Sequence, residues 1–356
     1  MHVCRDVTRD LYIEIHFLRI RPYPRALAPG DELREDRIRS RMLLLSTLAL
    51  AEAPTRTLSV DGTPTREAPS ALRDPAKKPA WSVELVGVPG GTFTFGALPG
   101  EGRPDGPPAR EVSVVPFFIA DVETPWGLFK QFCDPAQSAH WPAPDWTCPT
   151  VDKPLDRPEL PAVNVSWWDA AAFCNWLTAR EFGAAEQVYT FSGEGASRVV
   201  EVHLERKGYR MPTEVEWEWA ARAGNATSKY GSYDLPSWGC DYANTPTDTC
   251  MRGMADTFAQ ASPARPPADG KGAFKANAWG LFQMSGNVQE WVSDSEPNAK
   301  GAALFVIKGG SWDLGRVVVN ATTTPVTLDA GHVTYRMSDL PTRKRIDHGF
   351  RLARTR

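Results

Sequence analysis

The stretch "PAVNVSWWDAAAFCNWLTAREFG", residues 161–183, decides the fold class of this chain. Ser166 precedes an apolar run and is placed to cap a helix, Asp169 lies in the first predicted turn, and Gly183 marks the helix end. The buried face of the helix is expected to consist of four apolar residues: Ala172, Phe173, Trp176 and Leu177. The stretch therefore predicts one capped helix with a wide apolar face.

Strand signals come before this helix. Residues 81–96 and 111–124 carry short β-type runs that are broken by Pro and Gly. A second helix is predicted to follow them, with Thr124 as its N-cap and Pro125 at its first helical position. Strands are thus expected to lead directly into a short helix.

A hairpin and a third helix are predicted after residue 183. Residues 187–210 have the pattern of a hairpin. Residues 211–224 predict a helix in which Thr213 and Glu216 have capping-box spacing. Loops and short strands are expected from there to the C-terminal "HGFRLAR". Nothing alternates in the β-α-β manner that a parallel sheet requires, so the predicted fold class is α+β.

Composition supports a loop-rich globular domain. The 356 residues are 42% hydrophobic and 23% charged, and they include 13 Trp and 31 Pro. Large aromatic side chains are expected to anchor the loops. The net charge of −3 and the absence of a dense Lys/Arg patch argue against nucleic acid as a partner.

The first 80 residues differ from the rest. Three arginines precede the apolar run 42–51, and small residues follow it, in the manner of a signal peptide: Arg37, Arg39 and Arg41, then Ala49, Ala51 and Ala53. The alternative is a short helix in a disordered leader, and translation can start at Met1 or Met42. The run is too short to span a membrane. We predict a leader over 1–53, a Pro-rich linker over 54–80, an ordered domain over 81–356, and export.

Cysteine spacing fits export to an oxidising compartment. Cys133 and Cys148 flank a Pro-rich loop, and Cys240 and Cys250 flank a second loop, so each pair could form a local disulfide. Cys174 lies within the predicted apolar helix and is expected to be a buried small hydrophobe.

Seven segments together resemble the sulfatase-modifying-factor family, which includes formylglycine-generating enzymes. They occur in family order and are "VPGGTFTFG", "REVSVVPFFIADVETPWGLFKQFC", "PAVNVSWWDAAAFCNWL", "GYRMPTEVEWEWAARAG", "ANAWGLFQMSGNVQEWVSD", "VIKGGSW" and "HGFRLAR". The resemblance covers nearly all of residues 81–356. It implies a single domain related to C-type lectin folds, with little regular secondary structure and often with bound calcium.

The resemblance also implies two calcium sites built from oxygen ligands. At the first, Asn244 and Asp256 would supply side-chain oxygens, and Thr245 and Phe258 backbone carbonyls. The second would use the side chains of Gln283 and Glu290 and the carbonyls of Gly286 and Val288. Gln283 departs from the shorter Asn or Asp usual there. The alternative at both positions is a polar turn held by hydrogen bonds alone.

The cysteine pair expected of a copper oxidase of this family is missing. The resemblance places those two thiolates shortly after the Gly-Gly-Ser-Trp turn, where Leu314 and Val319 stand, and thiolates are the ligands that select Cu(I). No cysteine lies between Cys250 and Arg356. Gln289 also replaces a Trp usual in the family. We therefore expect neither copper binding nor formylglycine generation.

A different oxidation is still compatible with the sequence. The candidate side chains are Ser311, Trp312, Asp313, His332, Arg336, Asp347 and His348. Two His and one carboxylate would suit non-haem iron, and a relative, the pyoverdine-maturation oxidase, also lacks the cysteine pair. The alternative is that these are surface residues of a variable segment. Three glutamates on the third predicted helix, Glu214, Glu216 and Glu218, are expected to be solvated or to cap the helix.

Two hypotheses about function follow. The first is an exported, non-catalytic binding module stabilised by calcium, with an unknown protein, peptide or small-molecule ligand. The second is a divergent oxidoreductase acting on an exported peptide or small molecule. The folded positions of His332, His348 and Asp313 discriminate between them, because convergence in a cleft near Trp312 would favour the enzyme.

Overall fold

The computed structural model describes residues 83–97, 109–152, 156–225, 274–313 and 331–356. It also describes the backbone of five strands at 13–17, 56–58, 64–66, 316–320 and 325–329. All structural statements below concern these residues. Most of the predicted leader and linker, and the loop with Cys240 and Cys250, lie outside them.

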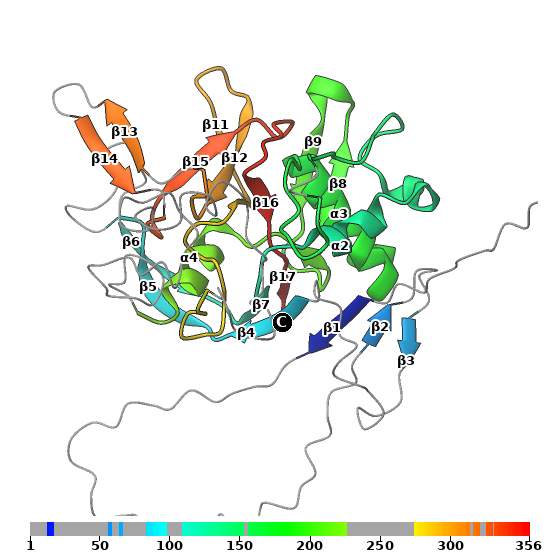
Figure 1. The fold of residues 1–356 in the computed structure, drawn as a ribbon, viewed down its shortest axis with the longest axis horizontal. Helices are drawn as coiled ribbons and strands as arrows, with labels where there is room; N and C mark the ends of the chain where they lie inside the picture. Colours follow the sequence, from blue (N-terminus) through cyan, green and yellow to red (C-terminus); the bar gives the residue numbers. More distant parts are fainter. Residues whose placement is uncertain are drawn as a thin grey trace, which may run out of the picture.

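The larger sheet is built on strands from both ends of the described domain (Figure 1). Its order is β10-β17-β7-β4-β1-β2-β3. The domain strands are β4 (Val83–Val88), β7 (Phe117–Ala120), β10 (Tyr209–Arg210) and β17 (Ala353–Thr355). The backbone of β1 (Ile13–Phe17), β2 (Arg56–Leu58) and β3 (Pro64–Arg66) extends the sheet beyond β4. β17 lies antiparallel between β7 and β10 and so joins the C-terminal segment to the sheet.

A four-stranded sheet carries the residues that concern function. Its order is β15-β12-β11-β16. The strands are β11 (Gln289–Pro297), β12 (Ala303–Lys308), β15 (Arg336–Asp339) and β16 (His348–Phe350). β16 runs parallel to β11 and pairs His348 with Gln289. A register shift interrupts the β11–β12 pairing between Trp291 and Ser295.

Three two-stranded hairpins complete the sheets. They are β5 (Gly91–Phe95) with β6 (Arg110–Val114), β8 (Tyr189–Ser192) with β9 (Val199–Val202), and β13 (Arg316–Asn320) with β14 (Pro325–Asp329). The strands predicted within 111–124 do not pair with each other, because β6 pairs with β5 and β7 with β4. The predicted hairpin over 187–210 is confirmed as β8–β9.

Both capped helices form as predicted. In α3 (Trp167–Glu181), Ser166 and Asp169 cap each other, and Gly183 just beyond the end has a φ of 93°. In α4 (Glu214–Arg222), Thr213 and Glu216 make the same reciprocal pair. Short 3-10 turns occupy Pro135–His140, Ala184–Glu186 and Gly195–Ser197.

The predicted cap of the remaining helix is wrong. Pro125, and not Thr124, is the N-cap of α2 (Trp126–Phe132), and no side chain caps this helix. The backbone of Thr124 is already used, since its N–H donates to the carbonyl of Phe350 at 2.9 Å and its carbonyl accepts from Ala162 N–H at 2.8 Å. These contacts hold Thr124 in place beside two other segments, and the helix begins after it.

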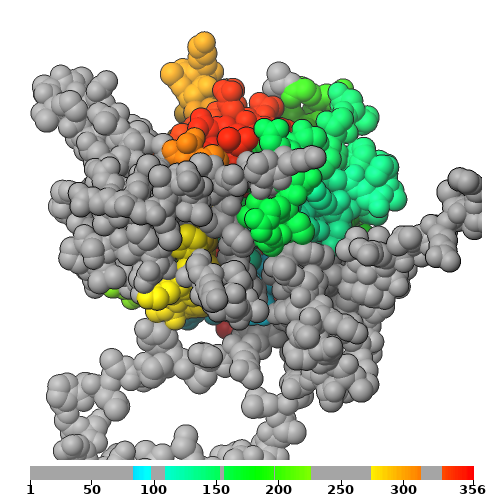
Figure 2. Space-filling view, viewed as in Figure 1, coloured from blue at the N-terminus to red at the C-terminus, as the bar shows by residue number. Residues whose placement is uncertain are grey.

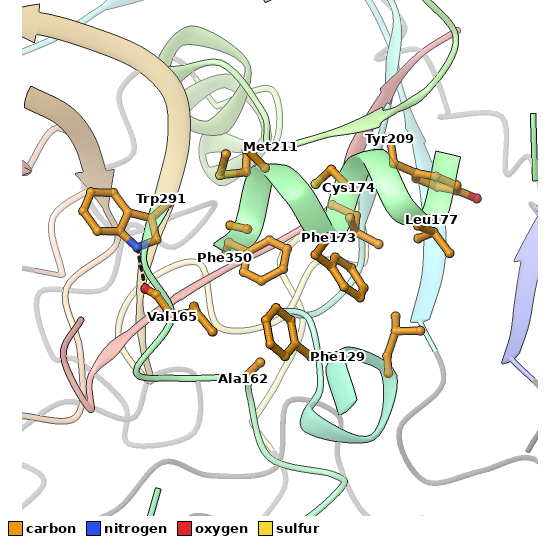
Figure 3. Close-up of a cluster of buried hydrophobic side chains, with 14 of the residues drawn as sticks. Phe129, Ala162, Val165, Phe173, Cys174, Leu177, Tyr209, Met211, Trp291 and Phe350 are labelled. Atoms are coloured by element: carbon orange, nitrogen blue, oxygen red, sulfur yellow. Dashed lines mark hydrogen bonds between the residues drawn. The ribbon is translucent and has the colours of Figure 1, made fainter. Parts of the chain in front are cut away.

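Buried aromatic side chains pin the loops to the core. Figure 3 shows the cluster in which Phe129, Phe173 and Phe350 lie together beneath α3. The indole N–H of Trp291 donates to the carbonyl of Val165 at 3.0 Å. Trp141, Trp167 and Trp219 donate in the same way to backbone carbonyls of other segments. Each such Trp buries apolar area and also satisfies a loop carbonyl.

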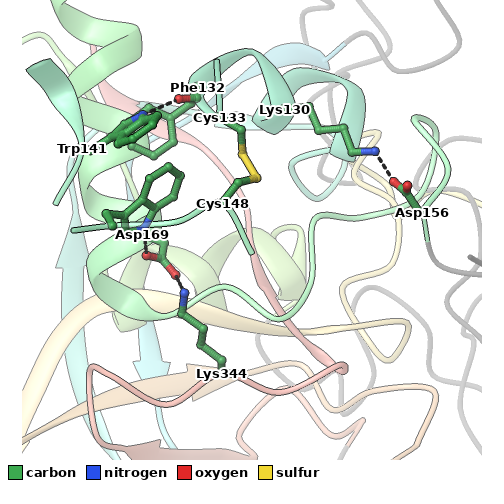
Figure 4. Close-up of a disulfide and its surroundings, with 9 residues drawn as sticks. Lys130, Phe132, Cys133, Trp141, Cys148, Asp156, Asp169 and Lys344 are labelled. Atoms are coloured by element: carbon green, nitrogen blue, oxygen red, sulfur yellow. Dashed lines mark hydrogen bonds and ion pairs between the residues drawn. A yellow bond between two sulfur atoms is a disulfide. The ribbon is translucent and has the colours of Figure 1, made fainter. Parts of the chain in front are cut away.

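The structure joins Cys133 to Cys148, one of the two pairings that the sequence offered (Figure 4). Cys174 is free and buried within α3, as predicted. Among the described residues, no helix is long and apolar enough to cross a membrane.

Candidate functional site

Two neighbouring residues of β11 divide the candidate site into two clusters. Successive side chains of a strand point to opposite faces, so Gln289 and Glu290 enter different surroundings. Gln289 meets Asp347 and, through it, Ser311. Glu290 meets Arg351 and Trp217. We call the first set the Asp347 cluster and the second the Glu290 cluster.

The Asp347 cluster is a hydrogen-bonded carboxylate at the start of β16. Oδ2 of Asp347 accepts from Ser311 Oγ at 2.9 Å and from Gln289 Nε2 at 3.0 Å. Oδ1 accepts from Arg345 Nε at 3.1 Å. The backbone N–H of Gln289 also donates to the Asp347 carbonyl at 2.8 Å, so the two residues are fixed to each other twice. Asp347 is buried, whereas Arg345 reaches solvent.

Two consecutive glycines deliver Ser311 to this carboxylate. Gly309 and Gly310 follow β12 with φ of 94° and 68°, the left-handed region that glycine enters without strain. A Cβ on Gly309 would lie 3.1 Å from a ring carbon of Trp217. The turn is held by Gly286 N–H donating to the Gly309 carbonyl and by Trp312 N–H donating to the Asn287 carbonyl. The backbone conformation that places Ser311 therefore requires the two glycines of the Gly-Gly-Ser-Trp motif.

His348 adjoins the cluster as a buried, neutral imidazole. Its ring lies edge-on to Trp291 with centroids 5.4 Å apart, and Nε2 is 3.9 Å from Oδ1 of Asp347. Neither ring nitrogen has a hydrogen-bond partner. Burial lowers the pKa of His348 to about 4, although the carboxylate of Asp347 opposes that shift.

Asp347 stays ionised at neutral pH. Burial raises the pKa of Asp347, but His348, Arg345 and the Ser311 hydrogen bond act against burial, and the net result is a lowered pKa. Because His348 is neutral near pH 7, Arg345 and Ser311 are the partners that stabilise the negative charge of Asp347 at that pH.

Several buried polar atoms beside this carboxylate are left unpaired. They are Gln289 Oε1, Trp312 Nε1, next to Ser311 in the chain, and both ring nitrogens of His348. Buried polar atoms without partners are uncommon in folded proteins and call for a specific explanation. Here they include a free N–H donor and a free amide acceptor, the two kinds of group that would bind a neutral polar ligand.

The structure brings together only some of the predicted catalytic candidates. Ser311, Trp312 and Asp313 are consecutive, and Asp313 N–H donates to Ser311 Oγ at 3.3 Å, which places them beside Asp347 and His348. His332 Nδ1 lies 2.7 Å from Thr334 Oγ1, and Arg336 donates to Glu214 and Glu296. No group of three or more His, Cys, Asp or Glu among the described residues is arranged to hold a metal ion.

The Glu290 cluster is a buried ion pair with an additional carboxylate. Arg351 donates from Nε and from NH2 to the two oxygens of Glu290, each at 2.6 Å, and Trp217 Nε1 donates to the same carboxylate at 2.8 Å. Asn287 Nδ2 donates to Oε1 of Glu123 at 3.0 Å, while Oε2 of Glu123 has no partner. Burial raises the pKa of Glu123 to about 8, against the attraction of Arg351.

The second predicted calcium site contains a buried side chain whose polar atoms are unpaired. Gln283 has a φ of 57° and is 2% exposed, and neither amide atom has a hydrogen-bond partner. Oε1 of Glu290 can accept a further contact besides the one from Arg351, and the unpaired Oε2 of Glu123 belongs to the Glu290 cluster. Gln283, Gly286, Val288, Glu290 and Glu123 are thus the residues that could hold calcium. The residues of the first site, Asn244, Thr245, Asp256 and Phe258, lie outside the described part of the chain.

The prediction that the α4 glutamates are solvated is wrong, although Glu216 does cap the helix. Glu214, Glu216 and Glu218 are all buried. Arg210 donates to both oxygens of Glu216 at 2.6 and 2.7 Å, and Arg222 pairs with Glu218 at 2.9 Å. Lys308, from β12, lies 3.7 Å from Glu214 and 3.5 Å from Glu218. Spacing along the helix was enough to suggest Arg222, which is four residues after Glu218, but not Lys308, which comes from a remote strand.

Comparison with known proteins identifies the family. The model of the sulfatase-modifying factor enzyme 1-like domain matches residues 71–356. The chain belongs to the sulfatase-modifying factor family. It is 28% identical over 314 residues to the inactive C-alpha-formylglycine-generating enzyme 2 of Mus musculus, which covers 76% of this chain and 85% of that protein. It is 26% identical over 278 residues to the formylglycine-generating enzyme of Bos taurus, and the match covers 64% of this chain and 62% of that enzyme.

A solved structure of the sulfatase-modifying factor type confirms the predicted fold. The crystal structure of CarF superposes with a TM-score of 0.55 at 23% identity, covering 78% of this chain and 99% of CarF. At this identity the likeness concerns the fold alone. Of the two positions where the family resemblance placed thiols, Leu314 lies outside the described residues, and only the backbone of Val319 is described, within β13.

Sequence reasoning missed Glu123, Asn287, Arg345 and Arg351 as parts of the two clusters. Glu123 and Arg351 are far apart in the sequence, near the two ends of the predicted domain. Neither carries a local motif of a metal or ligand site. The one available signal was the pattern of buried-strand residues flanking each of them, which predicts burial and hence a partner for each charge.

Proposed function

We propose that this chain is an exported, ligand-binding member of the sulfatase-modifying factor family that does not generate formylglycine and that uses calcium as a structural cation. The observation that carries the proposal is the pair of unpaired buried atoms in the residues around Asp347, namely Gln289 Oε1 and Trp312 Nε1. The sequence has no cysteine after Cys250 with which to hold copper beside them.

The Asp347 cluster suits binding better than catalysis. Its carboxylate is ionised and already accepts from Ser311, Gln289 and Arg345, so it orients its neighbours and is a poor general base. A carboxylate fixed by three donors leaves the free Gln289 oxygen and the Trp312 N–H in defined positions. Those two groups can accept from and donate to a neutral ligand. The oxidoreductase hypothesis would require a general base or a metal ligand set, and the Asp347 carboxylate is already engaged by three donors.

Two further observations support calcium and export. The unpaired amide of Gln283 and the unpaired Oε2 of Glu123 are oxygen-bearing groups that a cation would satisfy. The disulfide between Cys133 and Cys148 is suited to an oxidising compartment, and the apolar run 42–51 resembles the core of a signal peptide.

The first test separates formylglycine generation from binding. The purified chain is incubated with copper and a cysteine-containing sulfatase-type peptide, and the peptide mass is followed. We expect no conversion. Copper-dependent conversion would contradict the proposal. A matched test uses a displayed peptide library, from which the chain should enrich a defined set of peptides. Gln289→Leu and Ser311→Ala should lose this enrichment. Thr92→Ala, on the exposed face of the β5–β6 hairpin, is the control and should keep the enrichment.

The calcium component is tested by thermal unfolding with EGTA and with excess calcium. Calcium should raise Tm, and Gln283→Leu should reduce that rise. Glu201→Gln, an exposed substitution on β9, serves as the control. An identical Tm in EGTA and in calcium would remove the cation from the proposal.

A further inference from the structure

One carboxylate at the start of α3 joins three segments that are distant in sequence. Oδ2 of Asp169 accepts from Ser166 N–H at 2.8 Å, and Lys344 Nζ lies 3.0 Å from the same oxygen. Oδ1 accepts from Trp146 Nε1 at 2.6 Å (Figure 4). The carboxylate is 3% exposed, so these contacts occur out of water. Asp169 therefore links the helix cap to two separate loops.

The first loop is closed by the disulfide. Cys133 and Cys148 bracket a segment in which the rings of Trp141 and Trp146 lie 4.9 Å apart. The ring of Trp146 also packs 5.1 Å from Phe132, and Trp141 Nε1 donates to the Phe132 carbonyl at 2.9 Å. Trp146 is two residues from Cys148. The disulfide thus holds the short chain that carries Trp146 to Asp169.

The second loop connects β15 to β16, and we call its residues 340–346 the basic strap. It contains Arg343, Lys344 and Arg345 in a row and two exposed apolar residues, Leu340 at 41% and Ile346 at 49%. The carbonyl of Arg345 accepts from Asn164 N–H at 2.8 Å, and its guanidinium pairs with Asp347. Figure 2 shows the red C-terminal segment lying against the green part of the chain that contains α3. The strap therefore connects Asp169 to the Asp347 cluster.

These contacts form a continuous chain from the disulfide to the candidate site. It runs from the disulfide to Trp146, from Trp146 to Asp169, from Asp169 to Lys344, and from the adjacent Arg345 to Asp347. The two middle steps are contacts between separate segments, and the first and last steps join residues that are near neighbours along the chain. A change at the disulfide can therefore reach Asp347 without unfolding the core.

We propose that the Cys133–Cys148 disulfide is a latch that keeps the basic strap docked beside the Asp347 cluster, and that its reduction loosens the strap. In the reducing step, a dithiol attacks the bond, the sulfur–sulfur bond breaks, and each cysteine sulfur gains a hydrogen. The dithiol is oxidised to its own disulfide. No other oxidant or reductant enters the step.

The physical cause is the conformational entropy of the loop between Cys133 and Cys148. When the disulfide is intact, the 15-residue separation of its cysteines is closed, so fixing Trp146 on Asp169 costs little further chain entropy. After reduction the loop samples more conformations, Trp146 leaves Asp169 more often, and water reaches the carboxylate. Water weakens the pair between Asp169 and Lys344, which is one of the attachments of the strap to the start of α3; the other is the Pro341 carbonyl, which accepts from Trp168 N–H at 3.5 Å.

Limited proteolysis tests the latch without reference to any ligand. Trypsin cuts after Arg343, Lys344 and Arg345, and mass spectrometry of the fragments follows cleavage within the strap. Loss of a hydrogen bond to a charged partner changes an opening equilibrium by roughly tenfold or more. We expect cleavage of the strap to speed up by about that factor when the folded full chain is treated with a dithiol, and also in a Cys133→Ser/Cys148→Ser variant.

Matched variants keep the test decisive. Trp146→Phe keeps the ring but loses the donor to Asp169, so it should speed cleavage even with the disulfide intact. Trp141→Phe loses an indole N–H in the same loop without touching Asp169 and should have a smaller effect. Equal cleavage rates in the oxidised chain, the reduced chain and Trp146→Phe would overturn the proposal. Because the readout is strap cleavage, a failed ligand-binding experiment leaves it unaffected.

Discussion

Gln289 and Glu290 are neighbours on β11, yet the clusters they enter differ in how far their charged partners are exposed to solvent. Both oxygens of Glu290 accept hydrogen bonds from Arg351, and Trp217 adds a third donor from the core. On the other face, Gln289 and Ser311 donate to Asp347, whose remaining partner, Arg345, is half exposed. The first cluster lies wholly inside the fold. The second is open at one side and holds the unpaired acceptor Gln289 Oε1 beside both unpaired ring nitrogens of His348, whereas the unpaired atom of the first is the carboxyl oxygen Glu123 Oε2.

The difference separates a structural role from a binding role within one strand. Breaking a buried, fully paired charge is costly, so the Glu290 cluster is suited to holding the C-terminal segment against the core. Unpaired buried atoms reduce stability, and proteins keep such atoms mainly where they serve a function. The comparison therefore predicts a large stability effect on one face of β11 and a small one on the other.

The largest effect is expected from Arg351→Met. The substitution leaves Glu290 and Glu123 as buried carboxylates without their shared cation, and such a loss typically costs about 3–5 kcal/mol of unfolding free energy. Urea unfolding followed by Trp fluorescence measures it. The double variant Glu290→Gln/Arg351→Met should recover part of the loss, because it removes the uncompensated charge. A single variant as stable as the natural chain would show that the pair does not hold this face together.

A pH dependence of opposite sign should distinguish Glu123 from His348. Burial raises the pKa of Glu123 from 4.5 to about 8, so the stability this group contributes is complete below pH 4.5 and is lost as the pH rises through 8. In calcium-free buffer, the unfolding free energy of the natural chain should fall with pH across that window more steeply than that of Glu123→Gln. Parallel curves for the two proteins would show that the carboxyl is already ionised in the fold.

His348 should act at the acid end. Burial lowers its pKa from 6.5 to about 4, so the unfolded chain binds a proton before the folded chain does. Stability is complete above pH 6.5 and is lost as the pH falls toward 4. Because neither ring nitrogen has a partner, His348→Leu should fold, and its stability should fall less over this range. Tm measured from pH 7 to pH 4 checks this prediction. The control is His203→Asn, which replaces a partly exposed histidine just after β9. Its Tm should fall toward acid as much as that of the natural chain.

The smallest stability effect is expected from Ser311→Ala. It removes one of the three side-chain donors to Asp347, and losing such a hydrogen bond typically costs about 1–3 kcal/mol in a buried site. Arg345 and Gln289 keep the charge compensated, so the value should lie at the low end of that range. Chemical unfolding should show a smaller loss than for Arg351→Met. A loss as large would mean that the Asp347 cluster is as structural as the Glu290 cluster.

Local patterns were enough to predict much of the fold. Ser166 with Asp169 and Thr213 with Glu216 cap their helices through partners three residues away, so their contacts are encoded in short spacing. The Gly309–Gly310 turn was likewise visible as a motif. These features depend on neighbours along the chain and need no tertiary information.

The candidate site was less predictable because its contacts are remote. Thr124 has the residue type of an N-cap, but tertiary hydrogen bonds to Phe350 and Ala162 take its backbone instead. Glu218 was predicted to be solvated or to cap the helix. In the structure it pairs with Arg222 of the same helix and with Lys308 of the remote strand β12. The sequence named Ser311, Asp347 and His348 among several candidates, and only the fold could show that these three adjoin one another.

The position of β17 has a consequence for how the protein is made. This strand lies between β7 and β10, and Arg351, just before it, donates to the carbonyl of Ala120, 231 positions earlier in the chain. The sheet therefore cannot close on the ribosome while residues 351–355 are still unmade or inside the exit tunnel. Pairings of such long range are slow to form, and they leave this edge of β7 open until residues 351–355 are available to pair with it. Closure of the sheet is thus a late step in the folding of this domain.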